Sequence, residues 1–232
     1  MKKFFLLIDR LLSVFYPRVC VACGDLLQQN EPHLCLHCQL HLPETNYHLD
    51  PVSPLEVIFR GRVPVQNTLS FLSFRKGNSV QHILHQLKYK GNKEIGAYLG
   101  EMYGRKLASS GRLADADMIL PIPLHPKKMR LRGYNQSEWI AKGLSAGLGI
   151  PYDTSILVRR TFTETQTKKG RFARWQNVKD VFAVAHADRL AGRHVIVCDD
   201  VLTTGATTEA AIQKLLEVPD VRVSVVTLAT AQ

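Results

Sequence analysis

Apolar and polar residues alternate along most of the chain in a pattern that predicts strands interleaved with helices. One helix face is marked by apolar residues at the spacing i, i+3, i+4 and i+7, namely Val80, Ile83, Leu84 and Leu87. Gly91 follows at a position typical of a helix end. Short apolar runs predict strands at 69–74, 118–122, 181–184, 194–198 and 221–228, and residues 207–217 read as a further helix.

Two more helices complete the alternation. Ile95, Leu99 and Met102 begin one of them. Asn135 and Glu138 have the spacing of a capping box and begin the other. Strands that alternate with helices imply an α/β fold with a mainly parallel sheet covered on both faces. Ligands of such folds bind beyond the carboxyl ends of the strands.

The first 67 residues do not follow this alternation. Residues 1–16 carry apolar positions at helical spacing and end at Pro17, residues 17–42 are rich in cysteine and histidine, and 43–67 hold four prolines. We therefore expect an N-terminal helix, a metal-binding module, a connecting segment and an α/β domain over 68–232. The helix either packs on its own protein or associates loosely with a membrane. Its apolar run is too short for a span or a signal peptide, so we expect a cytoplasmic protein without a transmembrane segment.

Four cysteines in the second segment form two CxxC pairs. Cys20 and Cys23 make the first pair, and Cys35 and Cys38 the second. Two such pairs can complete a tetrahedral four-thiolate site, which favours a structural Zn²⁺. Metal binding would supply the folding energy that so short a segment cannot gain from apolar burial. An Fe–S cluster and two disulfides are the alternatives, although disulfides are unusual without secretion.

The charge of the chain is concentrated in one window. The net charge is +10, and residues 125–175 hold eleven Lys or Arg against three acids. Such a window suits a polyanion, either a pyrophosphate or a nucleic acid. For any single lysine, a solvated basic surface is the alternative.

The most specific motif follows the predicted strand at 194–198. The strand runs into Asp199 and Asp200, and a helix begins after the small polar turn of Thr203, Thr204, Gly205, Ala206 and Thr207. Amides and hydroxyls of the turn can bind a phosphate at the helix N-terminus. The two aspartates can accept hydrogen bonds from ribose hydroxyls, directly or through Mg²⁺. Alternatively, the motif merely caps the helix.

This motif resembles the signature of type I phosphoribosyltransferases, and the whole chain resembles the ComF family. The closer likeness rests on the two CxxC pairs and on three stretches: 87–91, 121–136 and 159–177. Together these motifs span residues 18 to about 230 in order.

The resemblance implies a type I phosphoribosyltransferase-like fold that binds phosphoribosyl pyrophosphate with Mg²⁺ on the Asp199–Asp200 loop. The segment 123–135 would hold the pyrophosphate, with Lys127, Lys128, Arg130 and Arg132 as contacts. A basic lid over 159–174 would close on the ligand, with Lys168 and Arg171 reaching the leaving pyrophosphate. Lys88 and Lys90 either contribute to the site or complement a helix end.

The resemblance also implies a role in competence, with single-stranded DNA and proteins of the competence machinery as partners. Aromatic residues such as Tyr134 and Trp139 fit a groove that stacks bases, but they fit a protein core equally well. No motif in the chain recognises an acceptor base. Two other functions therefore stay open, a base-salvage phosphoribosyltransferase and a regulatory protein that senses the ligand.

Overall fold

A computed structural model of the chain describes residues 17–160 and 181–231. The predicted helix at 1–16 lies outside the described residues, as do Lys168 and Arg171 of the predicted lid. None of the described helices is both long enough and apolar enough to span a bilayer.

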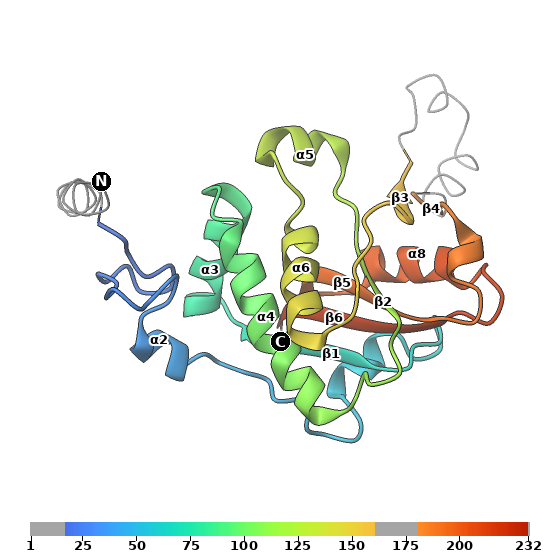
Figure 1. Cartoon of the computed structure of the whole chain (residues 1–232), viewed down its shortest axis with the longest axis horizontal. Helices are drawn as coiled ribbons and strands as arrows, with labels where there is room; N and C mark the ends of the chain where they lie inside the picture. Colours follow the sequence, from blue (N-terminus) through green and yellow to red (C-terminus); the bar gives the residue numbers. More distant parts are fainter. Residues whose placement is uncertain (1–16, 161–180, 232) are drawn as a thin grey trace, which may run out of the picture.

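The centre of the molecule is a four-stranded sheet in which every pairing is parallel (Figure 1). Its strands lie in the order β1 (Thr68–Phe74), β6 (Arg222–Ala231), β5 (His194–Leu202) and β2 (Met118–Pro121). The predicted fold class is confirmed, because helices cover both faces of this sheet and the four N-terminal cysteines cluster. β5 runs four residues beyond its predicted end and carries both aspartates.

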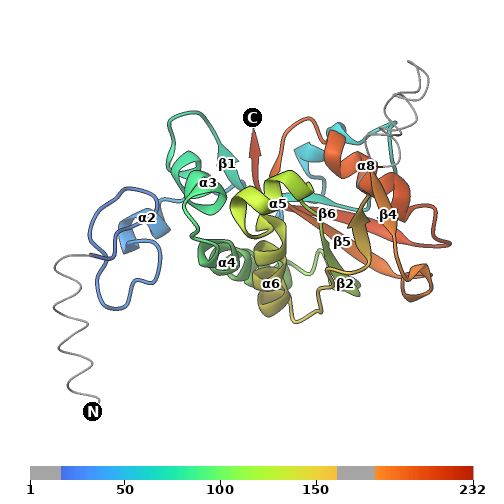
Figure 2. The ribbon, with the colours of Figure 1, turned by 90° about the horizontal axis from the view of Figure 1, so that it is seen from above.

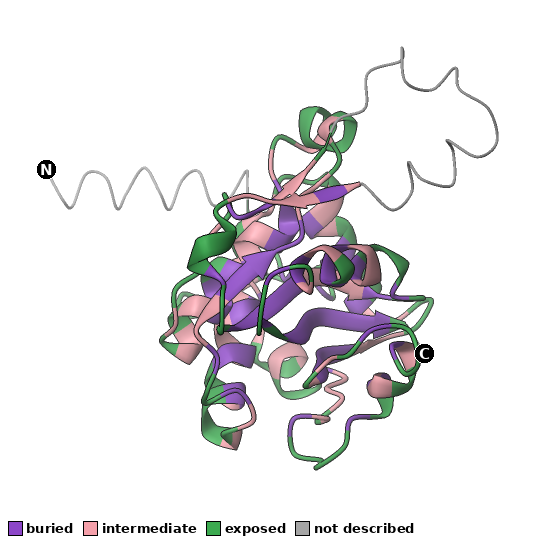
Figure 3. Ribbon diagram, turned by 90° about the vertical axis from the view of Figure 1, so that its right-hand side faces the viewer, coloured by how far each residue is buried: buried purple, intermediate pink, exposed green. Residues whose placement is uncertain are grey.

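Alternate side chains of the strands pack into two separate hydrophobic cores. On one face, Ile119 and Ile196 pack with three helices, α3 (Ser79–Tyr89), α4 (Glu94–Ser110) and α6 (Gln136–Leu148). On the other face, Leu120 and Val197 pack with α8 (Ala206–Leu215) and the 3-10 helix η1 (Pro54–Ile58). Figure 3 shows the buried strands between these more exposed layers. The strands are apolar on both faces because both faces are covered.

Glycines bring α4 and α6 into backbone contact. A Cβ added to Gly104 would lie 2.9 Å from the Cα of Gly147, and one added to Gly100 would lie 3.1 Å from the amide nitrogen of Leu144. Any larger residue would therefore push the two helices apart. This close contact sets the position of α6, whose first turn reaches the carboxyl end of β5.

The structure adds detail to three local predictions. The predicted strand at 181–184 is present as β4 (Phe182–Val184), but it pairs antiparallel with β3 (Leu157–Arg159) in a separate two-stranded sheet and does not belong to the main parallel sheet. The segment 123–135, for which no helix was predicted, contains the helix α5 (Pro126–Arg132), which Pro126 starts. Asn135 caps α6 alone, by accepting from the Ser137 amide instead of forming a capping box with Glu138.

The N-terminal module lies at one end of the molecule and packs against α4 (Figure 2). It contains the short helix α2 (Leu36–Leu40), and Leu34 is buried in the core with α4. The His33 ring lies 5.3 Å from that of Tyr98 on α4.

A further 3-10 helix, η3 (Ala187–Arg189), precedes β5.

Candidate functional site

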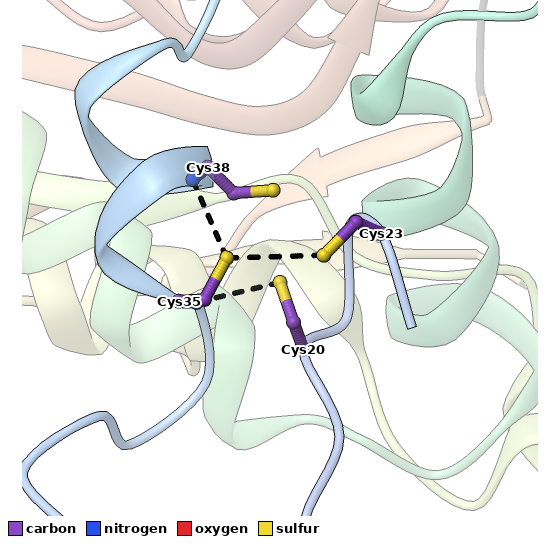
Figure 4. A group of neighbouring side chains, drawn as sticks. All are labelled: Cys20, Cys23, Cys35 and Cys38. Atoms are coloured by element: carbon purple, nitrogen blue, oxygen red, sulfur yellow. Dashed lines mark hydrogen bonds between the residues drawn. The ribbon is translucent and has the colours of Figure 1, made fainter. Parts of the chain in front are cut away.

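The four cysteines form a compact sulfur cluster (Figure 4). Their sulfur atoms all lie within 4.8 Å of one another, and the Cys23 and Cys35 sulfurs are 3.8 Å apart. A tetrahedron with metal–sulfur bonds of about 2.3 Å has edges of about 3.8 Å. The separation also exceeds a disulfide bond of about 2.05 Å, so the thiols are free. The cluster could hold a metal ion such as zinc.

Backbone amides prepare this cluster for a cation. The Cys35 amide donates to the Cys20 sulfur at 3.4 Å, and the Cys38 amide donates to the Cys35 sulfur at 3.4 Å. Burial tends to raise the pKa of Cys20, but the amides of Cys35, Cys23 and Ala22 lower it to about 7. Burial and the neighbouring thiols raise the pKa of Cys38. Four thiolates can therefore coexist here only when a cation compensates their charge.

The two predicted aspartates lie at the carboxyl end of β5, beside the start of α6. The Asp199 carboxylate accepts hydrogen bonds from the Ser137 hydroxyl at 2.9 Å and from the Asp200 amide at 2.8 Å. The Asp200 carboxylate forms an ion pair with the Lys88 ammonium at 3.1 Å. Residues from α3, α6 and β5 thus meet at one point.

Burial raises the pKa of Asp199 to about 7, and the charge of Asp200 adds to this effect. The Asp200 amide, the Ser137 hydroxyl and Lys88 act in the opposite direction. The aspartate pair therefore carries less than two full negative charges near neutral pH. A divalent cation or ribose hydroxyls at this place would favour the fully ionised pair.

A cavity of about 290 Å³ opens beside the aspartates. The predicted site residues that line it are Asp199, Asp200, Thr207, Lys88, Lys128 and Arg132. Of the predicted turn, Thr203, Thr204, Gly205 and Ala206 do not line it. Lys127 and Arg130 do not line the cavity and are exposed on α5. The cavity therefore combines two carboxylates with several basic side chains, one of which, Lys88, is paired with Asp200.

The turn after β5 has free amides and a tightly packed glycine. Gly205 caps α8 with a φ of 75°, and a Cβ there would lie 2.7 Å from Ile58 Cγ2. Both the backbone conformation and the packing therefore require glycine. Within the described residues, the amides of 203–208 donate to no backbone acceptor, and Thr203, Thr204, Ala206 and Thr207 are exposed. Such free amides at a helix N-terminus can bind a phosphate.

Contacts between α3 and the segment after α5 position the basic side of the cavity. The Tyr134 hydroxyl donates to the Leu87 carbonyl, next to Lys88. The Arg132 guanidinium donates to the Gln136 side chain at 2.8 Å and lies 5.2 Å from the Tyr89 ring centre. Arg132 is thereby held at the cavity. Lys90, by contrast, is exposed and does not line it.

Sequence reasoning missed two polar residues of the cavity. Ser137 binds Asp199 directly, and His125 caps α5 by accepting from the Lys127 amide at 3.1 Å. Arg159, predicted as the start of the lid, also lines the cavity, and burial lowers its pKa. Ser137 directly follows the motif stretch 121–136, but nothing in the sequence indicated its contact with Asp199.

Comparison with known proteins finds relatives by sequence, although no family model matches. The chain is 28% identical over 201 residues to the DNA utilization protein YhgH of Escherichia coli K12. The aligned residues cover 85% of this chain and 84% of the relative. It is 38% identical over 101 residues to competence protein F of Haemophilus influenzae, which covers 43% of this chain and 44% of the relative. These homologues confirm the family resemblance that the motifs indicated.

Solved structures overlap with parts of the chain. The glutamine phosphoribosylpyrophosphate amidotransferase of B. subtilis gives a TM-score of 0.40 at 21% identity, covering 56% of this chain and 26% of that chain. The adenine phosphoribosyltransferase of Leishmania donovani gives a TM-score of 0.34 at 16% identity, covering 56% of this chain and 64% of that chain.

Proposed function

We propose that this chain is a ComF-type, phosphoribosyltransferase-like protein that binds phosphoribosyl pyrophosphate and Mg²⁺ and supports competence and DNA utilization. One observation carries the ligand assignment. The cavity at the end of β5 joins the Asp199–Asp200 pair to basic residues of α3 and α5, beside a turn with free amides. The names of the homologues support the assignment to DNA utilization and competence.

Each part of the ligand has a matching group at the site. The turn 203–207 binds the 5′-phosphate through amides and hydroxyls. Asp199 and Asp200 accept hydrogen bonds from the ribose hydroxyls, while Lys88, Lys128 and Arg132 face the pyrophosphate. Lys168 and Arg171, which lie outside the described residues, are proposed to reach the pyrophosphate as well. Bound Mg²⁺ would be held by the aspartates and would offset the charge of the pyrophosphate.

The N-terminal module contributes a structural zinc site in this proposal. Cys20, Cys23, Cys35 and Cys38 hold Zn²⁺ in a closed four-thiolate shell, which leaves no position for a substrate. The module buries Leu34 against α4, on the helix layer that also positions α6. Zinc would thus stabilise the module and, through it, the helix layer beside the cavity.

Single-stranded DNA is the proposed macromolecular ligand, in a cytoplasmic protein that acts with the competence machinery. Trp139 on α6 has two cations near its ring, because the ammonium groups of Lys93 and Lys142 lie 4.8 Å and 5.0 Å from its centre. An aromatic ring flanked by cations suits base stacking beside a phosphate backbone. Binding of a fluorescent oligonucleotide should weaken steeply as salt rises, because phosphate contacts release counterions. Absence of binding at low salt would contradict this part of the proposal.

A thermal-shift panel tests the ligand assignment. Phosphoribosyl pyrophosphate with Mg²⁺ should raise the melting temperature, because a ligand at about one hundred times its Kd stabilises a protein by about 2.7 kcal/mol. Ribose 5-phosphate and pyrophosphate should each give a smaller shift, since each occupies only part of the site. Equal shifts with phosphoribosyl pyrophosphate and inorganic phosphate would contradict a built ribose site.

Transfer of the phosphoribosyl group to a base is a second candidate function. The aspartate pair and the phosphate-binding turn favour it, because both features serve displacement at the ribose C1. Basic side chains would then stabilise the charge that grows on the leaving pyrophosphate. Base-dependent release of pyrophosphate that is lost in Asp200→Asn would establish this activity. No pyrophosphate release with any of a panel of purines and pyrimidines would exclude those bases as acceptors.

A further inference from the structure

We propose that Arg62 is a positioning residue for the turn 203–207, an inference that rests on the proposed phosphate binding there. Arg62 follows η1 and lies 142 residues before Thr204 in the chain. Its Nη1 donates to the Ile58 carbonyl at 3.0 Å and to the Thr204 carbonyl at 3.1 Å, and its Nη2 pairs with the Glu209 carboxylate. One guanidinium therefore joins the segment beneath the turn, the turn itself and the first turn of α8.

The contact with Thr204 sets the direction of the next amide. The described chain has no cis peptide bond, so the Thr204 carbonyl and the Gly205 amide lie on opposite sides of their shared peptide plane. Because Arg62 holds the carbonyl, the Gly205 amide is directed away from Arg62. A glycine allows this peptide to rotate easily. Without Arg62, a rotated carbonyl would present its negative end to a phosphate.

The ion pair with Glu209 has a second consequence for an anion. Glu209 lies in the first turn of α8, where free amides and the helix dipole favour negative ligands. Its carboxylate would repel a phosphate in the turn 203–207. Arg62 neutralises it at close range, and the Glu209 side chain is only 19% exposed. Arg62 thus orients the turn and also offsets the acid beside it.

The packing under the turn makes this position rigid. An added Cβ at Gly205 would lie 3.0 Å from Cε1 of Phe59, and Phe59 is fully buried. Ile58 therefore contributes twice, through its side chain below Gly205 and through its carbonyl to Arg62. The segment 58–62 accordingly acts as the support on which the turn is built.

The test compares Arg62→Ala with Arg60→Ala on the full chain. Arg60 is exposed, so Arg60→Ala controls for the lost charge. Calorimetry with phosphoribosyl pyrophosphate and Mg²⁺ should show about tenfold weaker binding for Arg62→Ala. Binding of Mg²⁺-pyrophosphate, which does not use the turn, should stay unchanged in both variants. Merely structural damage would weaken both ligands together.

A double variant separates the two effects of Arg62. If Arg62 orients the peptide, Arg62→Ala/Glu209→Gln should still bind phosphoribosyl pyrophosphate weakly, whereas Glu209→Gln alone should bind it at least as well as the wild type. Equal affinity of Arg62→Ala and Arg60→Ala, with a wild type that binds, would overturn the inference and leave the proposed function standing. Equal weakening of both ligands in Arg62→Ala would overturn it as well. A wild type that binds no phosphoribosyl pyrophosphate would overturn the proposed function, and the inference with it.

Discussion

At the scale of single residues, the site depends on how Asp199 is solvated and paired. The Ser137 hydroxyl and the Asp200 amide both donate to one oxygen of its carboxylate. Burial and the charge of Asp200 nevertheless raise its pKa to about 7. The folded protein therefore holds a proton that the unfolded chain releases near pH 4, and this carboxylate destabilises the fold once it ionises.

Asp199→Asn should stabilise the protein without ligand, and the gain should depend on pH. Between about pH 4 and 7 the folded state binds one more proton than the unfolded chain does. The free-energy cost of ionising Asp199 in the folded protein is therefore complete above pH 7 and absent below pH 4. Asparagine keeps the oxygen that Ser137 and the Asp200 amide bind, but not the charge. Urea unfolding at pH 8 should show a gain of roughly 1–3 kcal/mol. The gain should shrink towards zero near pH 4. Equal stability of the two proteins at pH 8 would contradict the raised pKa.

At the scale of elements, the cavity is assembled by helices that meet at the end of β5. α4 positions α6 through glycine contacts, and α6 brings Ser137 to Asp199. α3 brings Lys88 to Asp200, and Tyr134 fixes the end of α3. The cysteine module packs on the outer side of α4. Loss of the module should therefore affect the layer that carries the site.

Cys35→Ser tests whether the four cysteines hold the metal and whether the metal stabilises the module. The variant should lose the bound zinc, because three thiolates bind it far more weakly than four, and the segment 18–42 should become sensitive to protease. His37→Ala is the matched control, because His37 is adjacent on α2 but is not one of the four clustered ligands. Zinc is measured by elemental analysis. Full zinc content in Cys35→Ser, or equal loss in His37→Ala, would contradict the four-cysteine assignment.

A chain of hydrogen bonds at the start of β5 resembles a catalytic triad but is buried. His194 at the start of β5 contacts the Asp115 carboxylate at 3.0 Å and the Ser224 hydroxyl at 2.9 Å, in the order of a catalytic triad. Ser224 is fully buried and His194 is 1% exposed, so no substrate can reach the hydroxyl. The chain of hydrogen bonds instead ties β5 to β6 at the amino end of the sheet, opposite the cavity.

At the scale of the whole molecule, local patterns predicted most of the fold. The strands of the sheet were predictable because both faces are buried, which leaves continuous apolar runs in the sequence. The four cysteines and the Asp199–Asp200 loop were predictable because each places its chemistry within a short stretch of the chain. Strand β3 and helix α5 were not, since β3 has only three residues and α5 has no apolar face to read. Strand β4 was predicted, but its pairing with β3 was not.

Contacts between distant segments could not be predicted. Lys88 meets Asp200, Ser137 meets Asp199 and Arg62 meets Thr204 only because the order of strands brings their elements together. No residue pattern within one segment encodes these pairs. The support of the turn 203–207 and the counter-ion of the aspartate pair are therefore properties of the fold.

The proposed function depends on binding of phosphoribosyl pyrophosphate with Mg²⁺ at the Asp199–Asp200 site. Isothermal titration calorimetry of the wild type beside Asp199→Asn/Asp200→Asn tests it most directly. We predict one site per chain in the wild type, a requirement for Mg²⁺, and no detectable binding in the folded double variant. Undiminished binding in the double variant, or no binding in the wild type, would contradict the account.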